Sequence, residues 1–381
     1  MASSGNSYGS PPESHELEVS IFGPGFGECI VLHLGNQEWA VIDSCLDPIS
    51  KSPAALRYFE SIGVSVARSV RLIVATHWHD DHIHGISRLF QHAKAAAFAC
   101  TQVVREPDFN EILGVWSDAR SLPGGSGIDE LRSILHELSR RTQRSSYPTP
   151  KLASANKILW ERAQEPIASI RALSPSDAAA IASISRLRTE QPQLAKARRR
   201  LPNLKPNDAS VVLSVVVGDQ NVLLGSDLQV RADRNLGWFA IFDEIAQDAV
   251  PHQVFKVAHH GSPNADHLDI WSRMLMREPW AIATPFVSGN VRLPSLDDCR
   301  RIMAQTQNAF LTAPPHPARF RDASRAVERT MKEATIAAYI IPGKFGHVRC
   351  RKHIAAPACA AWRVELLGNA LRMEDFAAAA R

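Results

Sequence analysis

Residues 70–85, VRLIVATHWHDDHIHG, decide the fold of this 381-residue chain. The run VRLIVATH reads as a buried strand that ends at His77. Three histidines and two aspartates then lie within six positions, from His77 to His82. Polar side chains at the end of a buried strand need either a partner or exposure to water, and a strand-end turn offers little room for so many. A bound metal ion resolves this conflict, so the stretch predicts a metal site.

The spacing of these residues predicts two neighbouring ions rather than one. His77 and His79 lie two positions apart on an extended turn, so we expect them to point to one side and to hold one ion. Asp81 and His82 are then expected to reach a second ion. His84 is expected either to orient a ligand or to lie at the surface.

Strand and helix patterns alternate around this stretch, which predicts an α/β fold. Three short β-rich runs over residues 17–45 are separated by glycine-rich turns, as in consecutive hairpins. Residues 209–217 and 222–227 read as a hairpin whose second strand ends at Asp227. Residues 253–262, QVFKVAHHGS, are again an apolar strand followed by polar residues. Candidate ligands therefore stand at the ends of three separate strands.

The chain is predicted to be one large domain with an insertion. Residues 1–16 are expected to be flexible, and residues 17–381 carry enough apolar side chains for one core. Residues 105–165 are weakly patterned, and we interpret them as an insertion or lid. Residues 167–177 resemble a strand followed by a helix start, and the whole helical, partly basic insertion is expected at about 105–206. Further strands are expected at about 335–375.

The composition argues against several classes of protein. With 45% hydrophobic and 22% charged residues, the chain is not expected to be disordered. It contains no apolar run of the roughly 18 to 20 residues that span a bilayer, and its first residues do not resemble a signal peptide, so we expect a cytoplasmic protein. Six scattered cysteines without a C-x-x-C pair argue against a disulfide scaffold and a zinc ribbon.

The most basic part of the chain lies between Arg186 and Lys205. Only one acid, Glu190, accompanies seven basic residues there, namely Arg186, Arg188, Lys196, Arg198, Arg199, Arg200 and Lys205. One interpretation is a solvated helix face. The other is a contact with a phosphate backbone, in which Arg198, Arg199 and Arg200 take part.

The motif H-x-H-x-D-H after an apolar strand resembles the hallmark of the metallo-β-lactamase superfamily. Within it, the chain looks most like the nuclease-type domain of competence DNA-internalisation proteins and their stand-alone relatives. The resemblance runs through EVSIFGPGFGECIVL, WAVIDSC, THWHDDHIHG, IRALSPSD, NDASVVL, VLLGSD and KVAHHGS, over residues 17 to about 300 without the insertion. It implies a four-layer αβ/βα sandwich.

The resemblance also implies roles for residues outside the first motif. Asp227 matches the carboxylate that bridges both ions. His259 is favoured over His260 as the last histidine ligand, and His260 is then an orienting residue or an acid. Asp43 is expected to orient a ligating histidine. Asn207 stands where many members of the superfamily have a further histidine ligand.

These features favour hydrolysis of a phosphodiester, expected in a nucleic acid, with two divalent metal ions, zinc or manganese, as cofactors. Asp81, Asp227 and His260 are the expected catalytic residues. Lys256, Ser262 and the basic segment are candidates for holding the phosphate chain.

Two other functions stay open at this stage. One is hydrolysis of a small molecule, such as a cyclic or choline phosphodiester, a lactone or a thioester. The other is a binding subunit whose metal site is structural or regulatory. A protein partner or regulator is a further hypothesis, since a free nuclease in the cytosol needs restraint. No membrane contact is expected, and the oligomeric state is open.

Overall fold

The computed structural model describes residues 9–23, 26–105, 127–143, 147–194, 205–245, 250–315 and 345–379. Within these ranges, strands form two eight-stranded sheets and a separate two-stranded hairpin. The first sheet, in spatial order, consists of β17 (Arg363–Leu367), β16 (Gly346–His353), β1 (Glu16–Gly23), β2 (Cys29–Leu34), β3 (Trp39–Ile42), β4 (Val70–Ala75), β5 (Ala97–Thr101) and β6 (Lys151–Ala153). The second consists of β18 (Leu371–Arg372), β15 (Ala309–Leu311), β12 (Leu275–Ala283), β11 (His252–Lys256), β10 (Gln220–Leu224), β9 (Leu213–Val217), β8 (Ala168–Ala172) and β7 (Ile158–Arg162). The hairpin consists of β13 (Phe286–Ser288) and β14 (Val291–Leu293).

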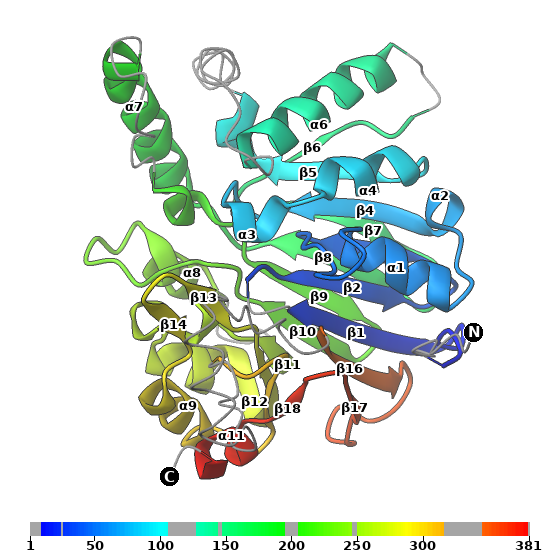
Figure 1. Ribbon diagram of the computed structural model, residues 1–381. Helices are drawn as coiled ribbons and strands as arrows, with labels where there is room; N and C mark the ends of the chain where they lie inside the picture. The colour runs from blue at the N-terminus through cyan, green and yellow to red at the C-terminus, as the bar shows by residue number, and fades with distance from the viewer. Residues whose placement is uncertain are drawn as a thin grey trace, which may run out of the picture.

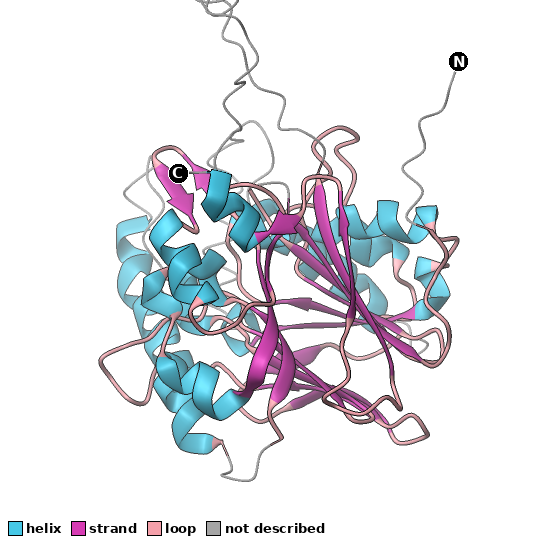
Figure 2. Cartoon of the chain, turned by 90° about the horizontal axis from the view of Figure 1, so that it is seen from below, coloured by secondary structure: helices cyan, strands magenta, loops and turns pink. Residues whose placement is uncertain are grey.

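The central core lies between the two sheets, and helices lie on the outer sides of the strands (Figure 2). Ile30 of β2 packs into this central core, whereas its neighbour Val31 packs toward the helices of the first sheet. In β10, Val222 packs centrally and Leu223 packs toward the helices of the second sheet. Because both faces of such strands are buried, their sequences are continuous apolar runs.

Two groups of helices cover the outer faces of the sheets (Figure 1). The helices beside the first sheet are α1 (Ala54–Ser61), α2 (Val66–Ser69), α3 (Asp80–Ile83), α4 (Ile86–His92) and α6 (Gly127–Thr142). Those beside the second are α8 (Gly237–Glu244), α9 (Leu296–Met303) and α11 (Met373–Ala379). The longest helix within the described ranges, α7 (Asp177–Leu194), stands out at the edge of the molecule. None of the helices in the described ranges combines the length and apolarity that crossing a bilayer requires.

The predicted α/β fold is confirmed, with two sheets between layers of helices. The predicted hairpin that precedes Asp227 is the antiparallel pair β9 and β10. The region 105–206 differs from a simple insertion, because β6 extends the first sheet and β7 and β8 extend the second. Of the strands expected at about 335–375, β16, β17 and β18 are present, and residues 335–344 lie outside the described ranges. Of the N-terminal segment 1–16, residues 1–8 also lie outside them, and Ser10 accepts a hydrogen bond from Arg351.

Three strands, each paired in parallel with a neighbour in its own sheet, deliver the polar loops to one place. β4 lies parallel to β3 and β5, and both β10 and β12 lie parallel to β11. His77 follows the end of β4, Asp227 follows the end of β10, and His260 follows the end of β11. The first loop comes from one sheet and the other two loops come from the second, so the site lies where the two halves of the sandwich meet.

Candidate metal centre

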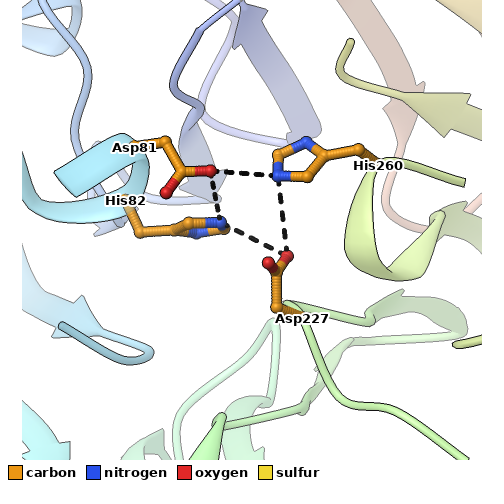
Figure 3. A group of neighbouring side chains, drawn as sticks. All are labelled: Asp81, His82, Asp227 and His260. Carbon is orange, nitrogen blue, oxygen red and sulfur yellow. Dashed lines mark hydrogen bonds and ion pairs between the residues drawn. The ribbon is translucent and has the colours of Figure 1, made fainter. Parts of the chain in front are cut away.

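Two groups of potential metal ligands lie side by side where these loops meet. The first consists of Asp81, His82, Asp227 and His260 (Figure 3), and the second consists of His77, His79 and Asp227. Asp227 belongs to both groups. The three polar loops predicted from the sequence therefore converge.

The first group is compact and buried. Asp81 Oδ2 lies 3.1 Å from His260 Nε2, and Asp227 Oδ1 lies 3.3 Å from His82 Nε2. The other two separations, His82 Nε2 to Asp81 Oδ2 and His260 Nε2 to Asp227 Oδ1, are 3.7 and 3.8 Å. All four side chains are buried. Two imidazole nitrogens and two carboxylate oxygens thus surround one point.

The second group faces the other oxygen of Asp227. His77 Nε2 lies 3.8 Å from Asp227 Oδ2 and 3.2 Å from His79 Nδ1. Asp227 Oδ1 thus faces the first group and Oδ2 faces the second, so this carboxylate is shared by both groups.

Asp43 determines which nitrogen His77 and His82 present to the site. Its carboxylate accepts hydrogen bonds from the Thr76 hydroxyl at 2.7 Å and from His82 Nδ1 at 2.7 Å. Because the Thr76 hydroxyl donates to Asp43, it accepts from His77 Nδ1, which lies 3.0 Å away. Both rings therefore carry their proton on Nδ1 and turn a lone pair on Nε2 toward Asp227.

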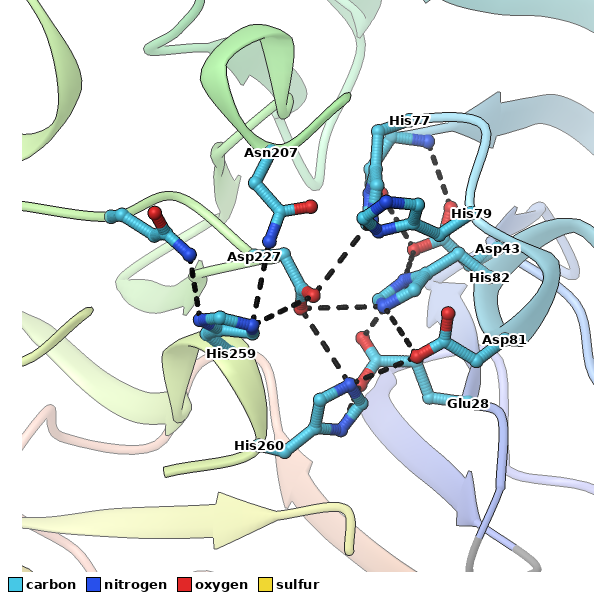
Figure 4. Close-up of polar contacts among 12 residues, drawn as sticks. Glu28, Asp43, His77, His79, Asp81, His82, Asn207, Asp227, His259 and His260 are labelled. Carbon is cyan, nitrogen blue, oxygen red and sulfur yellow. Dashed lines mark hydrogen bonds and ion pairs between the residues drawn. The ribbon is translucent and has the colours of Figure 1, made fainter. Parts of the chain in front are cut away.

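Thr284 and Glu28 orient His260 in the same way. The Thr284 carbonyl oxygen, which only accepts, lies 2.9 Å from His260 Nδ1, so this nitrogen carries the proton and Nε2 faces Asp81. The Thr284 hydroxyl donates to Glu28 at 2.5 Å, and Lys256 Nζ lies 2.7 Å from the same Glu28 oxygen. Figure 4 shows these two supporting carboxylates, Asp43 and Glu28, close to the His82 ring.

Two buried atoms at the centre have no hydrogen-bond partner among the described residues, His82 Nε2 and Asp227 Oδ1. Leaving such polar atoms unsatisfied costs about 1 to 3 kcal/mol each. They face one another across 3.3 Å, and a cation that binds to both would satisfy them. Imidazole nitrogens and carboxylate oxygens suit divalent metals such as zinc and manganese. The residues present thus fit a metal ion.

The pKa shifts follow from burial and from this cluster of charges. Burial lowers the pKa of His77 and of His79, so both rings are neutral donors at pH 7. Burial also opposes protonation of His82, but surrounding carboxylates, first Asp227 and then Glu28, raise its pKa well above the ordinary value. His260 follows the same pattern, with Asp227 as the main opposing influence. The site therefore favours positive charge at these two Nε2 atoms, which a bound cation would supply.

The two central carboxylates are held ionised. Burial on its own raises the pKa of Asp227 and of Asp81, but nearby imidazoles, above all His82 and His260, keep both pKa values below their ordinary range. Ionised oxygens in a buried cavity are strong ligands for a divalent cation.

A third potential ligand group, Glu28, Asp43 and His82, has a different role. His82 Nδ1 is already bonded to Asp43, and the Lys256 ammonium group supplies the positive charge beside Glu28. Both side chains of this ion pair are almost inaccessible to water. The group therefore supports the ligands and does not itself need an ion.

The placement of the two adjacent histidines differs from the expectation. His259 was favoured beside Asp81 and His82, but His260 occupies that position. His259 lies on the other side of Asp227, with Nε2 3.7 Å from Asp227 Oδ2 and 3.4 Å from Asn207 Nδ2 (Figure 4). The cause is a run of left-handed backbone, φ 46° at His259 and 54° at His260, which points the second ring inward.

The remaining residues that the sequence suggested for orienting ligands or holding substrate differ in their burial and contacts. Lys256 is fully buried against Glu28, so it is not placed to hold a phosphate chain as expected. Ser262 is buried just after His260, and its backbone N–H donates to the carbonyl oxygen of His259. His84 is half-buried, and its carbonyl oxygen accepts from the Ser44 hydroxyl. Arg198, Arg199 and Arg200 lie outside the described residues.

Sequence reasoning missed Glu28, Thr76 and Thr284. Glu28 had a detectable signal, since an acidic residue directly before the buried strand CIVLHL needs a partner. Thr76 and Thr284 had none, because a threonine next to a strand end is ordinary. Their roles depend on contacts with Asp43 and Glu28, which are distant in the sequence.

The chain is similar to known proteins in a family model and in several solved structures. A family model described as the metallo-beta-lactamase superfamily matches residues 22–265. Three solved structures with a similar fold are a metallo-β-lactamase fold protein, YhfI, from Bacillus subtilis, a putative metallo-β-lactamase from Thermotoga maritima and a metallo-β-lactamase with a HARLDQ motif from Cronobacter sakazakii. The first is 11% identical and covers 77% of this chain and 95% of its own, with a TM-score of 0.35. The Thermotoga maritima protein is 16% identical and covers 56% of this chain and 79% of its own, with a TM-score of 0.31. The Cronobacter sakazakii protein is 14% identical and covers 62% of this chain and 73% of its own, with a TM-score of 0.30.

No curated protein matches the chain. The family model nevertheless spans well over half of it, including β2 to β11 and every ligand group described above. The chain belongs to the metallo-β-lactamase superfamily.

Proposed function

We propose that this protein is a metal-dependent phosphodiesterase that acts on nucleic acid and uses two divalent cations, zinc or manganese. The observation that carries the proposal is the position of Asp227, which turns one oxygen toward Asp81, His82 and His260 and the other toward His77 and His79. The proposal also extends the resemblance to the nuclease-type domains of competence proteins.

The buried charge supports two ions rather than one. Four carboxylates lie buried at the centre, Glu28, Asp43, Asp81 and Asp227, and Lys256 is the one ammonium group that the described residues place against them. When the histidines bind metal as neutral ligands and all four carboxylates are ionised, these residues together carry three negative charges. Two divalent cations and one hydroxide balance this charge, whereas a single cation leaves it uncompensated in a site that excludes water.

The roles of the residues follow from this arrangement. Bound divalent cations supply Lewis acidity and lower the pKa of water, which makes a nucleophile available at neutral pH. Asp81 and His260 would hold one ion together with His82, and Asp227 would keep both ions at a constant separation. Asp43 fixes the proton of His82 on Nδ1, so the ring cannot turn its N–H toward the cation.

Substitutions of two proposed ligand aspartates and of a neighbouring exposed aspartate provide a matched test. Asp81→Asn and Asp227→Asn should lower hydrolysis of bis(p-nitrophenyl) phosphate and of a labelled oligonucleotide by about 10³-fold, because the lost ligands remove several kcal/mol of charge stabilisation. Asp80 directly precedes Asp81 in α3 and is exposed, so it provides the control. The Asp80→Asn variant should keep full activity. Metal content of each variant is measured in parallel. Full activity of both Asp81→Asn and Asp227→Asn would contradict the proposal.

One observation favours a small-molecule ester as an alternative substrate. The ring of Phe286 lies 5.2 Å from that of His260 and 5.5 Å from that of Phe26, and Phe26 is 42% exposed. This aromatic surface beside the site suits an apolar substituent. Ionic strength separates the two cases, since binding of a polyanion weakens steeply with salt and binding of a neutral ester hardly changes.

A further inference from the structure

Beyond the two ligand groups, His259 leads to a second polar arrangement. Asn207 Nδ2 lies 3.4 Å from His259 Nε2, and Gln229 Nε2 lies 3.2 Å from His259 Nδ1. Each amide stands close in sequence to a charged residue, since Asp208 follows Asn207 directly and Arg231 lies two positions after Gln229. The chain therefore passes from the metal centre to a charged cluster within one or two residues.

That cluster consists of two arginines held by one aspartate. Arg186, on α7, donates from Nη1 to Asp208 Oδ2 at 3.2 Å, and Arg231 donates from Nη2 to Asp208 Oδ1. Each carboxylate oxygen thus holds one guanidinium group in place. The arginine side chains remain 26% and 32% exposed. They are oriented by Asp208 and still accessible to a ligand.

A small hollow lies beside Asp208 and Arg231. Its lining includes Asn207, Asp208, Gln229 and Arg231. Asn207 is 8% exposed, and its Oδ1 has no hydrogen-bond partner among the described residues. In Figure 4 this oxygen points toward the side on which His77 and His79 lie. Leaving a buried amide oxygen without a hydrogen-bond donor costs about 1 to 3 kcal/mol. This cost indicates that a polar ligand or a water molecule donates a hydrogen bond to Asn207 Oδ1.

The surrounding sequence carries a clear excess of positive charge. Between Arg186 and Lys205, seven basic residues accompany only Glu190, and Arg231 and Asp208 add one charge of each sign. Of the cluster itself, the two arginines outnumber Asp208 by one positive charge, and guanidinium groups bind phosphate oxygens through paired N–H donors.

We propose that Arg186 and Arg231, positioned by Asp208, bind a backbone phosphate next to the one that is hydrolysed, so that the substrate is a nucleic-acid strand. This inference rests on the proposed function. Asn207, whose amide contacts His259 beside Asp227, directly precedes Asp208, so the arginine pair adjoins the metal centre and can meet a neighbouring phosphate of the same strand.

The test compares strand binding with hydrolysis of a small diester. For the metal-loaded Arg186→Gln/Arg231→Gln protein, the Kd of a fluorescent phosphorothioate single strand should rise about tenfold at about 50 mM salt, as measured by anisotropy. The slope of log Kd against log salt should fall by about 1.4, since each lost single-strand contact contributes about 0.7. The kcat/KM for bis(p-nitrophenyl) phosphate should stay unchanged.

The control is Arg363→Gln, which removes an exposed arginine that pairs with Glu16 on the first sheet and should change none of these values. The single variants Arg186→Gln and Arg231→Gln should each give about half of the change in slope. An unchanged Kd and slope in the double variant, or a wild-type protein that binds no strand, would overturn the inference. If the wild type binds the strand through these arginines but hydrolyses no diester, the proposed function fails and the binding site stands.

Discussion

At the scale of single residues, Lys256 and Glu28 form a buried ion pair next to the proposed ligands. Both side chains are almost fully buried, and the Lys256 ammonium also donates to the Val257 carbonyl oxygen at 3.0 Å. Glu28 in turn accepts from Thr284, whose carbonyl oxygen orients His260. Breaking the pair therefore leaves a charge without a partner and also loosens a proposed metal ligand.

Lys256→Met should lower the free energy of unfolding by about 3 to 5 kcal/mol, because it leaves the Glu28 carboxylate buried and uncompensated. The double variant Glu28→Gln/Lys256→Met removes both charges and should recover much of this loss. Denaturant unfolding of the metal-free proteins measures both values. A single variant as stable as the wild type would show that the pair does not contribute to the stability of the site.

At the scale of elements, the short helical turn η3 (Ala258–Gly261) decides which histidine enters the site. Three consecutive residues, His259, His260 and Gly261, have φ values of 46°, 54° and 80°. Side chains with a Cβ atom disfavour this region by about 1 to 2 kcal/mol per residue. The contacts of both histidines with the site therefore hold the turn in a strained conformation.

Gly261→Ala tests this turn, with Gly63→Ala as its control. A Cβ atom at Gly261 would lie 3.2 Å from both Ile302 and Pro294, whereas at Gly63 (φ 69°) it would meet nothing within 4 Å. The free energy of unfolding of both variants should fall by about 1 kcal/mol, because alanine disfavours the left-handed backbone conformation. Only Gly261→Ala should also weaken metal binding, by about tenfold, because it displaces His260. Calorimetric titration with zinc measures this difference, and equal affinities in the two variants would refute it.

At the scale of the whole molecule, the site joins the two halves of the sandwich. His77, His79, Asp81 and His82 come from the first sheet and its helices, whereas Asp227 and His260 come from loops of the second sheet. Ions bound between them would cross-link the halves, and without ions the buried carboxylates repel one another. Metal binding and global stability should therefore be coupled.

Chelation should lower the thermal midpoint of the wild-type protein, and readdition of zinc or manganese should restore it. A metal at 100 times its Kd stabilises the folded state by about 2.7 kcal/mol per site. Asp227→Asn should abolish most of this response, because it removes an oxygen from both ligand groups. A midpoint that does not respond to chelator, in protein shown to contain metal, would argue against ions at the junction.

The sequence by itself determined the local features of this protein. The apolar run ending in HWHDDH predicts a buried strand and a metal site, since ligand spacing within six residues depends only on local geometry. The hairpin before Asp227 and the strand before His259 followed from patterns of the same kind. Such patterns reflect interactions between residues that are close in the sequence.

Only the tertiary structure decided which side chains meet. It placed His260 rather than His259 beside Asp81, 179 positions away in the sequence, through a left-handed turn that no local pattern predicts. It also buried Lys256 against Glu28 and brought Arg186 and Arg231 onto Asp208. The physical reason is that the direction of a side chain at a strand end depends on packing against segments distant in the chain, which the local order of residues does not encode.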